Sequence, residues 1–349
     1  MTRRMNRRRA ADWEPLAALW LAWPHNPNTW PGEASDGTRR VAGVERTYRR
    51  IVEAAVESHP VRVLAADDVA ARAEDRLRGL IAVEIVDIPT DDAWVRDYGP
   101  QFVFDRHGDL TCVAFRYNAW GGKYPPWQSD DAAAEKIARW LDLPVSVSGL
   151  TIEGGAMEFD GTGRMLTTPA CVLDPNRNDA SWNLQAVESE LRRTLGVEHI
   201  AWFDGGGIDG DDTDGHVDQL IRFVDPENVV VAVAGDEDAD DADALRKNLS
   251  QVDWWSNRTD PPVRVHPIRT PPPRTVDGRP VPQSYCNFVR LGPDRILMPT
   301  FGCDATDDAA EGLLRELSGA EVTPIDCRDL AWGLGALHCA TLEQPATLE

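Results

Sequence analysis

Apolar residues recur along this chain with two spacings, and each spacing predicts one kind of element. Over residues 39–58 they recur every three or four positions, as Val41 and Val44 show, which is the pattern of one face of an amphipathic helix. Elsewhere, short apolar runs bounded by Gly, Pro, Asn or Asp predict strands. The first such run, residues 19–23, leads into a turn that contains Pro and Asn.

Extended to the whole chain, these patterns predict hairpins that alternate with helices. The expected helices cover residues 39–58, 67–78, 130–141, 181–195, 239–249 and 307–317. The expected strands cover residues 19–23, 61–64, 81–88, 101–104, 111–115, 150–159, 163–168, 199–203, 219–224, 228–233, 261–268, 284–289, 295–298 and 322–325. The unit recurs about every seventy residues, so five units would fill the chain. This order predicts an α/β fold with hairpins, rather than a plain βαβ succession, and no strong linker divides it.

The composition restricts the partners that the protein can bind. The 349 residues carry a formal net charge of −22. Such a field disfavours nucleic acid and anionic membrane surfaces and concentrates cationic small molecules, although acidity that only keeps the protein soluble is the simpler interpretation. No apolar run reaches the eighteen or so residues that a membrane span needs. We therefore expect a small cationic partner and neither nucleic acid nor a membrane.

The cysteines and the N-terminus indicate a cytoplasmic protein. The six cysteines show no C-x-x-C spacing, so a disulfide framework and a structural zinc site are not expected. The first nine residues include five arginines but no apolar stretch, so they are not a secretory signal. We expect residues 1–12 to form a disordered basic tail and residues 13–349 to form a single catalytic domain.

Four short segments carry the residues that could do chemistry. They are GLGALHC, which ends at Cys339, WVRDYGP around Asp97, IEGG with Glu153, and DGHVD with His216 and Asp218. Each has an ordinary interpretation: a free cysteine is usually a buried core residue, and a buried carboxylate such as Asp97 or Glu153 can simply pair with an arginine. Together, one nucleophile, one base and three carboxylates are the inventory of a covalent catalyst acting on a cation.

These carboxylates suit a planar, delocalised cation. A guanidinium group offers five N–H donors in a fixed fork, which Asp97 and Asp218 could hold from different sides. The thiolate of Cys339 would attack its carbon to give a tetrahedral adduct. His216 could protonate the departing ammonia and then deprotonate the water that hydrolyses the covalent intermediate. Glu153 would orient or polarise the histidine. This chemistry requires no metal or organic cofactor.

The acidic loop over residues 209–215 does not fit a calcium site. If Gly215 stood at the sixth position of an EF-hand loop, Gly210 and Ile221 would stand at the first and twelfth, where carboxylates are needed. Another divalent metal on His216 and its neighbours would need further ligands, and no second histidine lies at helical i+4 spacing. We therefore expect no metal in the site.

Four motifs in this order resemble the agmatine deiminase family, which includes bacterial peptidylarginine-deiminase-like proteins. They are WVRDYGP (94–100), IEGG (152–155), GHVD (215–218) and HC (338–339), supported by AWP (22–24), NAWGG (118–122), NRN (176–178) and SYCNF (284–288). The similarity extends from about Trp13 to Pro345. It implies the pentein fold, a five-module α/β propeller with pseudo-fivefold symmetry, and often a homo-oligomer.

The resemblance also implies an activity and residue roles. Family members typically hydrolyse agmatine to N-carbamoylputrescine and ammonia, which points to putrescine biosynthesis and to a hydrolase of C–N bonds in linear amidines. By motif match, the nucleophile is Cys339, the general acid/base is His216, and the guanidinium-binding carboxylates are Asp97 and Asp218. Glu153 matches a glutamate near the histidine, Trp94 matches an aromatic residue lining the site, and Asp92 is a further candidate for substrate contact.

Two departures from the family pattern leave the substrate open. The segment before Cys339 has fewer glycines than is usual, and residues 120–127 form a shorter segment than in agmatine deiminases. Free, methylated or peptidyl arginine are therefore alternative substrates, and a substrate with a carboxylate would call for an arginine clamp, with Arg96 and Arg116 as candidates. Amidino transfer to an amine and a catalytically silent metal- or polyamine-binding module are the remaining alternatives.

Overall fold

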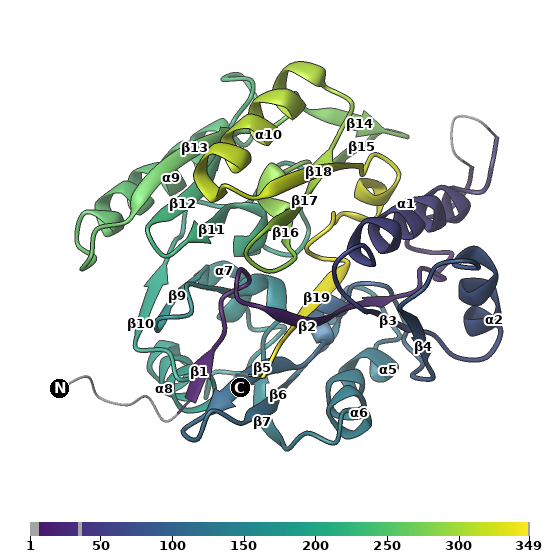
Figure 1. Ribbon diagram of the computed structural model, residues 1–349. Helices are drawn as coiled ribbons and strands as arrows, with labels where there is room; N and C mark the ends of the chain where they lie inside the picture. The colour runs from purple at the N-terminus through teal and green to yellow at the C-terminus, as the bar shows by residue number, and fades with distance from the viewer. Residues whose placement is uncertain (1–6, 34–36, 348–349) are drawn as a thin grey trace.

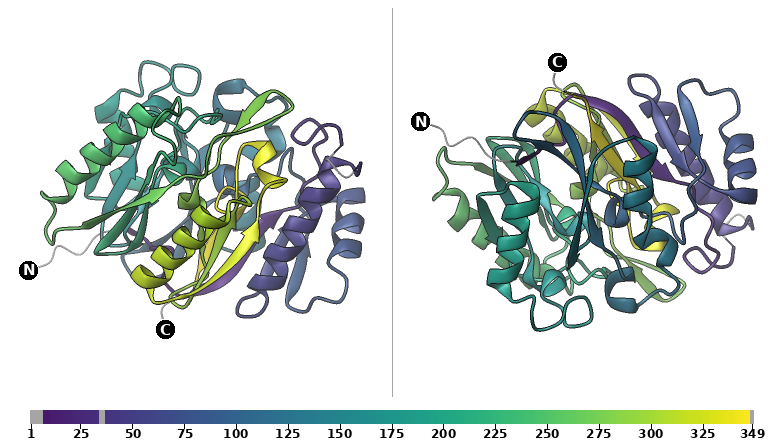
Figure 2. Two further views of the ribbon diagram at one scale, coloured as in Figure 1. Left: turned by 90° about the horizontal axis from the view of Figure 1, so that it is seen from above. Right: turned by 90° about the horizontal axis from the view of Figure 1, so that it is seen from below.

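Small sheets with helices outside them make up the protein. The computed structural model describes residues 7–33 and 37–347. Within these residues the strands form five sheets of three or four strands and one separate two-stranded hairpin. The longer helices lie around the outside of the molecule and the strands lie toward its middle (Figures 1 and 2). The predicted α/β class is therefore confirmed.

The first two sheets contain both ends of the described chain. The first has the order β19 (Thr341–Pro345), β2 (Leu16–Ala22), β3 (Val61–Leu64) and β4 (Val83–Val86), with α1 (Arg40–Ala55) and α2 (Asp67–Arg76) in its connections. The second has the order β1 (Arg7–Arg9), β5 (Gln101–Asp105), β6 (Leu110–Arg116) and β7 (Val145–Thr151), with α4 (Ala119–Gly122), α5 (Gln128–Asp131) and α6 (Ala133–Trp140) between its last two strands.

The other three sheets follow in chain order. They contain β8 (Glu158–Phe159), β9 (Arg164–Thr167) and β10 (His199–Trp202); β11 (Ile221–Asp225), β12 (Asn228–Val233) and β13 (Arg264–Arg269); and β16 (Val289–Arg290), β17 (Arg295–Thr300) and β18 (Glu321–Asp326). Their connecting helices are α7 (Pro169–Val172) and α8 (Leu184–Leu195), then α9 (Ala242–Ser256), then α10 (Asp304–Ser318). The separate hairpin is β14 (Arg274–Val276) with β15 (Arg279–Val281).

One unit recurs in all five sheets. An antiparallel strand pair is followed by a helical crossover to a third strand that lies parallel to the second, as β5, β6 and β7 illustrate. Parallel neighbours need such a crossover, which explains the alternation of hairpin and helix in the sequence. In the first sheet the antiparallel pair is β19 with β2, so the last strand of the chain joins the sheet that its N-terminal part begins (Figure 1).

A short helical turn precedes the first strand of each unit. These turns are α3 (Val95–Tyr98), η1 (Gly154–Ala156), η2 (Val217–Gln219), η3 (Tyr285–Asn287) and η4 (Leu330–Gly333). Successive turns contact one another, α3 with η1, η1 with η2 and η2 with η3. Residues that lie far apart in the sequence are therefore brought to one place, and the motif residues lie in or beside these turns.

The amphipathic pattern of α1 shows how the helices are held. Val44, Tyr48, Ile51 and Val52 are all fully buried, as the three-to-four spacing predicted. Burial of each such side chain stabilises the fold by roughly 1.5–3 kcal/mol. None of the helices in the two described ranges has both the length and the apolar character needed to cross a bilayer.

The prediction of a disordered tail over residues 1–12 is wrong for residues 7–12. The strand β1 pairs antiparallel with β5, Arg9 is buried and donates to the Ala10 carbonyl, and Asp12 is buried against the Arg222 guanidinium at 3.0 Å. The arginine run looked like a solvated charge run, but its members have carboxylate, amide and carbonyl partners inside the fold. Residues 1–6 lie outside the described residues.

Other expectations failed where polar residues or glycines interrupt a strand. The helices over residues 39–58, 67–78, 181–195, 239–249 and 307–317 are confirmed in position, while 130–141 is divided into α5 and α6. The strand expected over 150–159 is two strands, β7 and β8, with η1 between them, so Glu153 lies between the strands, immediately before η1. The first half of 284–289 is η3. The strands β1, β14, β15 and β19 were not predicted.

Candidate active site

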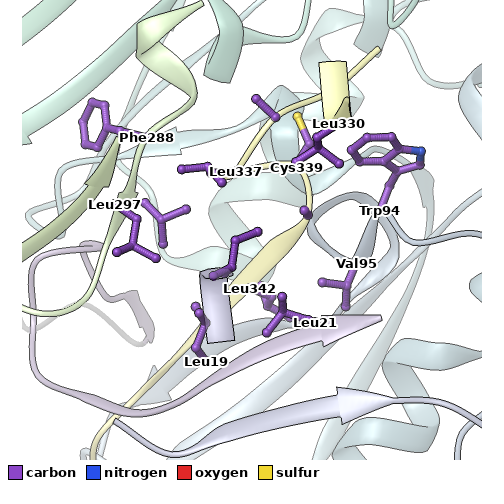
Figure 3. Packing of buried hydrophobic residues seen from close by; sticks show 14 of the residues in the cluster. Leu19, Leu21, Trp94, Val95, Phe288, Leu297, Leu330, Leu337, Cys339 and Leu342 are labelled. Carbon is purple, nitrogen blue, oxygen red and sulfur yellow. The ribbon is translucent and has the colours of Figure 1, made fainter. Parts of the chain in front are cut away.

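A cavity of about 160 Å³ lies beside the convergent turns. Of the residues predicted for the site, Asp92, Trp94, Asp97 and Cys339 line it. The remaining three, Glu153, His216 and Asp218, are fully buried directly behind these residues. Figure 3 shows Cys339 beside the Trp94 ring, at the edge of the apolar packing formed by Leu337, Leu342 and their neighbours. The structure thus brings together all seven predicted residues.

The thiol of Cys339 has polar neighbours although the residue packs within the hydrophobic core cluster. Its sulfur is 3.6 Å from Asp218 Oδ2, to which the S–H can donate, and it accepts from Asn287 Nδ2 at 3.2 Å. Burial, and then the negative charges of Asp218 and Asp97, raise the pKa of the thiol well above its usual value. The sulfur is therefore a neutral thiol at neutral pH.

Asn287 also fixes the backbone that carries the thiol. Its Oδ1 accepts from the amides of His338 and Cys339 at 3.0 and 3.3 Å, and its side chain is fully buried. A close approach by another side chain explains the glycine four residues before Cys339, since a Cβ on Gly335 would lie 2.5 Å from the Trp94 ring. The backbone around the nucleophile is thus packed on both sides.

Asp97 faces the cavity with both oxygens hydrogen-bonded. Its Oδ2 accepts from the Trp120 indole at 3.0 Å, and its Oδ1 accepts from the amide of Gly155 at 3.0 Å. Burial raises the pKa of Asp97 to about 6, opposed by His216 and reinforced by the charge of Asp218. A cation in the cavity would stabilise the ionised form, so the site favours a positively charged ligand.

His216 lies between two carboxylates. Its Nδ1 is 3.7 Å from Asp97 Oδ1, and its Nε2 is 3.5 Å from Glu153 Oε2. Burial alone would lower the pKa of His216, but Asp97, Glu153 and Asp218 outweigh it and raise the pKa to about 9. The imidazole is therefore protonated at neutral pH, as a proton donor must be.

Glu153 combines the two roles that its sequence left open. Arg177 donates to its Oε1 at 2.8 Å, while Oε2 faces the histidine. Burial would raise the pKa of Glu153, but Arg177 and His216 together lower it to about 2. The same arginine donates to the Thr213 carbonyl, and Thr213 Oγ1 accepts from the amide of His216 at 3.0 Å. Arg177 thus holds the imidazole of His216 through Glu153 and the backbone of His216 through Thr213.

Several buried polar atoms at the centre of the site have no hydrogen-bond partner among the described residues. They are Glu153 Oε2, Asp218 Oδ1 and both ring nitrogens of His216. Buried polar atoms are nearly always paired in folded proteins, so a group of unpaired ones next to a cavity indicates a place for a polar ligand. The two unpaired oxygens belong to carboxylates and can only accept, so a group with N–H donors would satisfy them.

Arg96 and Arg116, the two candidates for binding a substrate carboxylate, have other partners in the structure. Arg96 pairs with Glu343 and not with Asp97, and both partners are buried away from the cavity. Arg116 pairs with Asp131 at 2.5 Å. Neither arginine lines the cavity, so the two candidates for a carboxylate clamp are wrong. The cationic residues in the cavity wall are Lys123 and Arg279, which face the carboxylates of Asp214 and Asp212.

Asp92 and Trp94 form another part of the cavity wall. Asp92 accepts from the Thr29 hydroxyl and from the amide of Ala93, and burial raises its pKa to about 6. The Trp94 ring lies 5.5 Å from the Trp30 ring, which keeps it in place. Asp92 thus supplies a carboxylate to the cavity in addition to Asp97.

The sequence did not single out several residues that complete the site. Three of them lie in motifs that carried the family resemblance: Trp120 in NAWGG, Arg177 in NRN and Asn287 in SYCNF. These motifs were the sequence signal from which the three residues could have been found. Gly155 and His338 stand inside predicted motifs but received no role. These residues act by contact with Cys339, Asp97, Glu153 and Asp218, and sequence spacing does not reveal such contacts.

Gly155→Ala is expected to lower kcat/KM by about 100-fold or more. A Cβ at this position would lie 2.7 Å from His216 Nδ1, 2.8 Å from Asp97 Oδ1 and 3.0 Å from Asp218 Oδ2, so the methyl group must displace all three. Steady-state kinetics measures the loss. The control is Gly312→Ala in α10, where the added Cβ meets nothing within 4 Å and should leave activity unchanged. Equal activity in both variants would contradict the packed arrangement.

Comparison with known proteins finds similar sequences and structures over nearly the whole chain. The agmatine deiminase of Stutzerimonas stutzeri is 33% identical, with 96% of this chain and 95% of that protein covered. The solved structure of Enterococcus faecalis agmatine deiminase is 26% identical and superposes with a TM-score of 0.89 over 98% of this chain and 97% of that one. A DDAH from Pseudomonas aeruginosa, 12% identical, shares the fold with a TM-score of 0.53, covering 94% and 99% of the two chains.

The fold and the site together identify the class of protein. It is an α/β enzyme of the pentein fold, with a thiol and carboxylates around one cavity. The model of the Porphyromonas-type peptidyl-arginine deiminase family matches residues 8–345. The chain belongs to that family, and the resemblance seen in its motifs is confirmed.

Proposed function

We propose that this protein is an agmatine deiminase, a hydrolase that cleaves a guanidinium C–N bond of agmatine to give N-carbamoylputrescine and ammonia. The observation that carries the proposal is the position of the Cys339 thiol, which shares one cavity with Asp97 and lies 3.6 Å from Asp218. Relatives with this activity in their names align over nearly the whole chain.

The carboxylates supply the binding of the guanidinium. Asp97 offers its two oxygens from the cavity wall, and Asp218 offers the unpaired Oδ1 from behind. A guanidinium fork that donates to both carries its carbon toward the sulfur of Cys339. Its positive charge also lowers the pKa of the thiol, which burial and the charges of Asp218 and Asp97 raise, so the S–H proton leaves to solvent and the thiolate forms when the substrate binds.

The reaction then proceeds through a covalent intermediate. The thiolate forms a bond to the guanidinium carbon, and the resulting tetrahedral adduct loses a terminal nitrogen as ammonia after His216 donates its proton. His216 next takes a proton from water, and the hydroxide attacks the same carbon. The C–S bond then breaks as the proton of the new hydroxyl passes to the departing sulfur, which restores the Cys339 thiol and releases the ureido product. Glu153, held by Arg177, keeps the imidazole oriented.

The rest of the cavity favours a second positive charge on the substrate. Asp92 is a carboxylate in the wall and is proposed to contact the ammonium group of agmatine, while Trp94 packs against its chain. The cavity cations Lys123 and Arg279 already face acidic side chains, which disfavours a carboxylate-bearing substrate such as free arginine. Deimination of methylated or peptidyl arginine, amidino transfer and a non-catalytic binding role remain the alternatives.

The arrangement of the units supports a further part of the proposal. The five ββαβ units are proposed to form the pseudo-fivefold α/β propeller of the pentein fold, with the short turns around its centre. Residues 13–349 then act as one catalytic domain together with residues 7–12. The protein is also proposed to act in the cytoplasm as a homo-oligomer, in a route to putrescine, as its family resemblance implies.

The expected pH dependence of the activity follows from the ionisation of Asp97 and His216. Asp97 must be ionised to bind the cation, and its pKa is about 6, so kcat/KM should fall as the pH drops below that value. His216 must be protonated to expel ammonia, and its pKa is about 9, so activity should fall as the pH rises above that value. A bell-shaped profile between these limits is expected. Full activity at pH 4.5 would contradict the role of Asp97.

Product analysis tests the proposed function. The purified protein is incubated with agmatine, and the products are separated and identified by mass spectrometry. N-carbamoylputrescine and ammonia in equal amounts support hydrolysis. If an added amine is required and carries away the amidino group, the protein is an amidinotransferase instead.

A further inference from the structure

Beneath the cavity, a buried histidine joins a substrate-facing carboxylate to the N-terminal segment. We propose that His338, anchored by Asp12, is a positioning residue that fixes Asp218 with one oxygen turned toward the guanidinium. This inference rests on the proposed function for its kinetic test and on the contacts below for its geometry. It gives residues 7–12 a role in the reaction, although they lie far from the catalytic motifs in the sequence.

Both ring nitrogens of His338 face carboxylates. Its Nδ1 is hydrogen-bonded to Asp218 Oδ2 at 2.8 Å. Its Nε2 has no hydrogen-bond partner among the described residues and lies 3.5 Å from Asp12 Oδ2, an electrostatic contact when the ring is protonated. All three side chains are buried. Because His338 occupies Oδ2, the Oδ1 of Asp218 is the oxygen left without a partner. With Oδ2 engaged by His338 and by the Cys339 thiol, Oδ1 remains available to accept from a rigid guanidinium fork.

Asp12 is itself held firmly. Arg222 donates to its Oδ2 at 3.0 Å, and the same guanidinium donates to the carbonyls of Cys286 and Phe288 at 3.0 and 2.9 Å. Arg222 is fully buried, and its Nε donates to Glu158. The anchor of the histidine is therefore part of a buried network that reaches three of the five units.

The histidine is also tied to the nucleophile through the backbone. His338 and Cys339 are neighbours, and Asn287 Oδ1 accepts from both of their amides. Arg96 Nε donates to the His338 carbonyl at 3.2 Å. With the backbone fixed in this way, the position of the imidazole determines where Asp218 lies relative to the sulfur.

The same cluster has the donor types of a metal site, but its charges argue against one. The ligand atoms of Asp12, His338 and Glu343 lie within 4.8 Å of one another. However, Arg222 already neutralises Asp12, and Arg96 pairs with Glu343. A divalent cation would have to enter beside two buried guanidinium groups, at a high electrostatic cost. The cluster therefore serves to hold Asp218.

Substitutions at position 338 distinguish a role of His338 in positioning Asp218 from a role in packing alone. An asparagine at position 338 places an N–H close to where Nδ1 stands but cannot reach Asp12, whereas alanine removes both contacts. His338→Ala should raise KM for agmatine by about 10- to 100-fold, with a smaller fall in kcat. His338→Asn should recover most of the loss in KM, and Asp12→Ala should raise KM in the same direction as His338→Ala. Calorimetry of agmatine binding in Cys339→Ala, with and without His338→Ala, should show the same ratio in Kd.

The control is Asp160→Asn, which weakens another buried ion pair, with Arg164, outside the site. It should lower the melting temperature and leave KM unchanged. If His338→Ala lowers the melting temperature without changing KM or Kd, or if asparagine restores nothing, the proposal is overturned. Bound divalent metal in the purified protein, lost in His338→Ala, would also overturn it.

A readout without substrate separates this inference from the proposed function. Imidazole nitrogen NMR of the full chain should show the His338 signal shifting in Asp218→Asn and in Asp12→Asn, and an unchanged signal in both variants overturns the contacts. Absence of ammonia release from agmatine by the wild-type protein overturns the proposed substrate and leaves the NMR test of His338 intact.

Discussion

Cys339→Ala is expected to lower the rate of ammonia release from agmatine by about 10⁴-fold or more, because removal of the nucleophile eliminates the covalent route. The variant should still fold and still bind agmatine, since the side chain contributes a small part of a large apolar cluster and the carboxylates remain. Initial rates measure the loss, and calorimetry measures the retained binding. Mass spectrometry of the quenched wild-type enzyme should detect an amidino adduct on the Cys339 peptide.

The matched control for this variant is Cys327→Ala. Cys327 is also buried, and burial raises its pKa well above the usual value, but it lies outside the cavity wall. Its replacement should leave kcat and KM within about twofold of the wild type. Substantial turnover by Cys339→Ala would sink the covalent mechanism, and equal losses in both cysteine variants would indicate general damage to the fold.

Asp218→Asn is the second change with a large expected effect, a fall in kcat/KM of about 10³-fold. The amide has nearly the same shape as the carboxylate, but it removes a buried negative charge and can present an N–H to the N–H donors of the guanidinium. The Oδ2 contact to His338 and the nearby thiol would be perturbed as well. Steady-state kinetics should show the loss, with Asp160→Asn as the control for a buried aspartate outside the site.

A second measurement distinguishes lost binding from lost chemistry in Asp218→Asn. The Kd for agmatine in the Cys339→Ala background should weaken when Asp218→Asn is added. Unchanged binding and unchanged kcat/KM would show that this carboxylate does not hold the guanidinium, and Asp97 alone would then have to supply the binding.

The sequence predicted the chemistry better than the architecture around it. Cys339, His216 and the three carboxylates stand in short motifs whose residue types indicate a reaction, and the structure gathers them. The reason they meet is a feature of the fold, because each lies in, immediately before or a few residues after the short turn that precedes the first strand of its unit. No spacing in the chain reveals that these turns pack together.

The sequence-based predictions that failed did so for specific physical reasons. Strand β19 contains Glu343 and Gln344, so it lacked the apolar pattern of a strand, yet it is fully buried because Arg96 pairs with the glutamate. The arginines of residues 7–9 looked like a solvated tail because a run of charges does not show that its backbone pairs with β5, or that Arg8 and Arg9 find partners in Glu14 and Gln101. Asn287 stands in the motif SYCNF, which carried the family resemblance, but the motif did not show which of its residues contacts the thiol.

The central claim, hydrolysis of agmatine by Cys339, is tested most directly by ammonia release from a panel of agmatine, arginine, dimethylarginine and an arginine-containing peptide, with Cys339→Ser as the control. We expect release from agmatine, at a kcat/KM well above that of the other compounds, and none from the variant. Release from another member of the panel in preference to agmatine would contradict the proposed substrate, and release that persists in Cys339→Ser would contradict the mechanism.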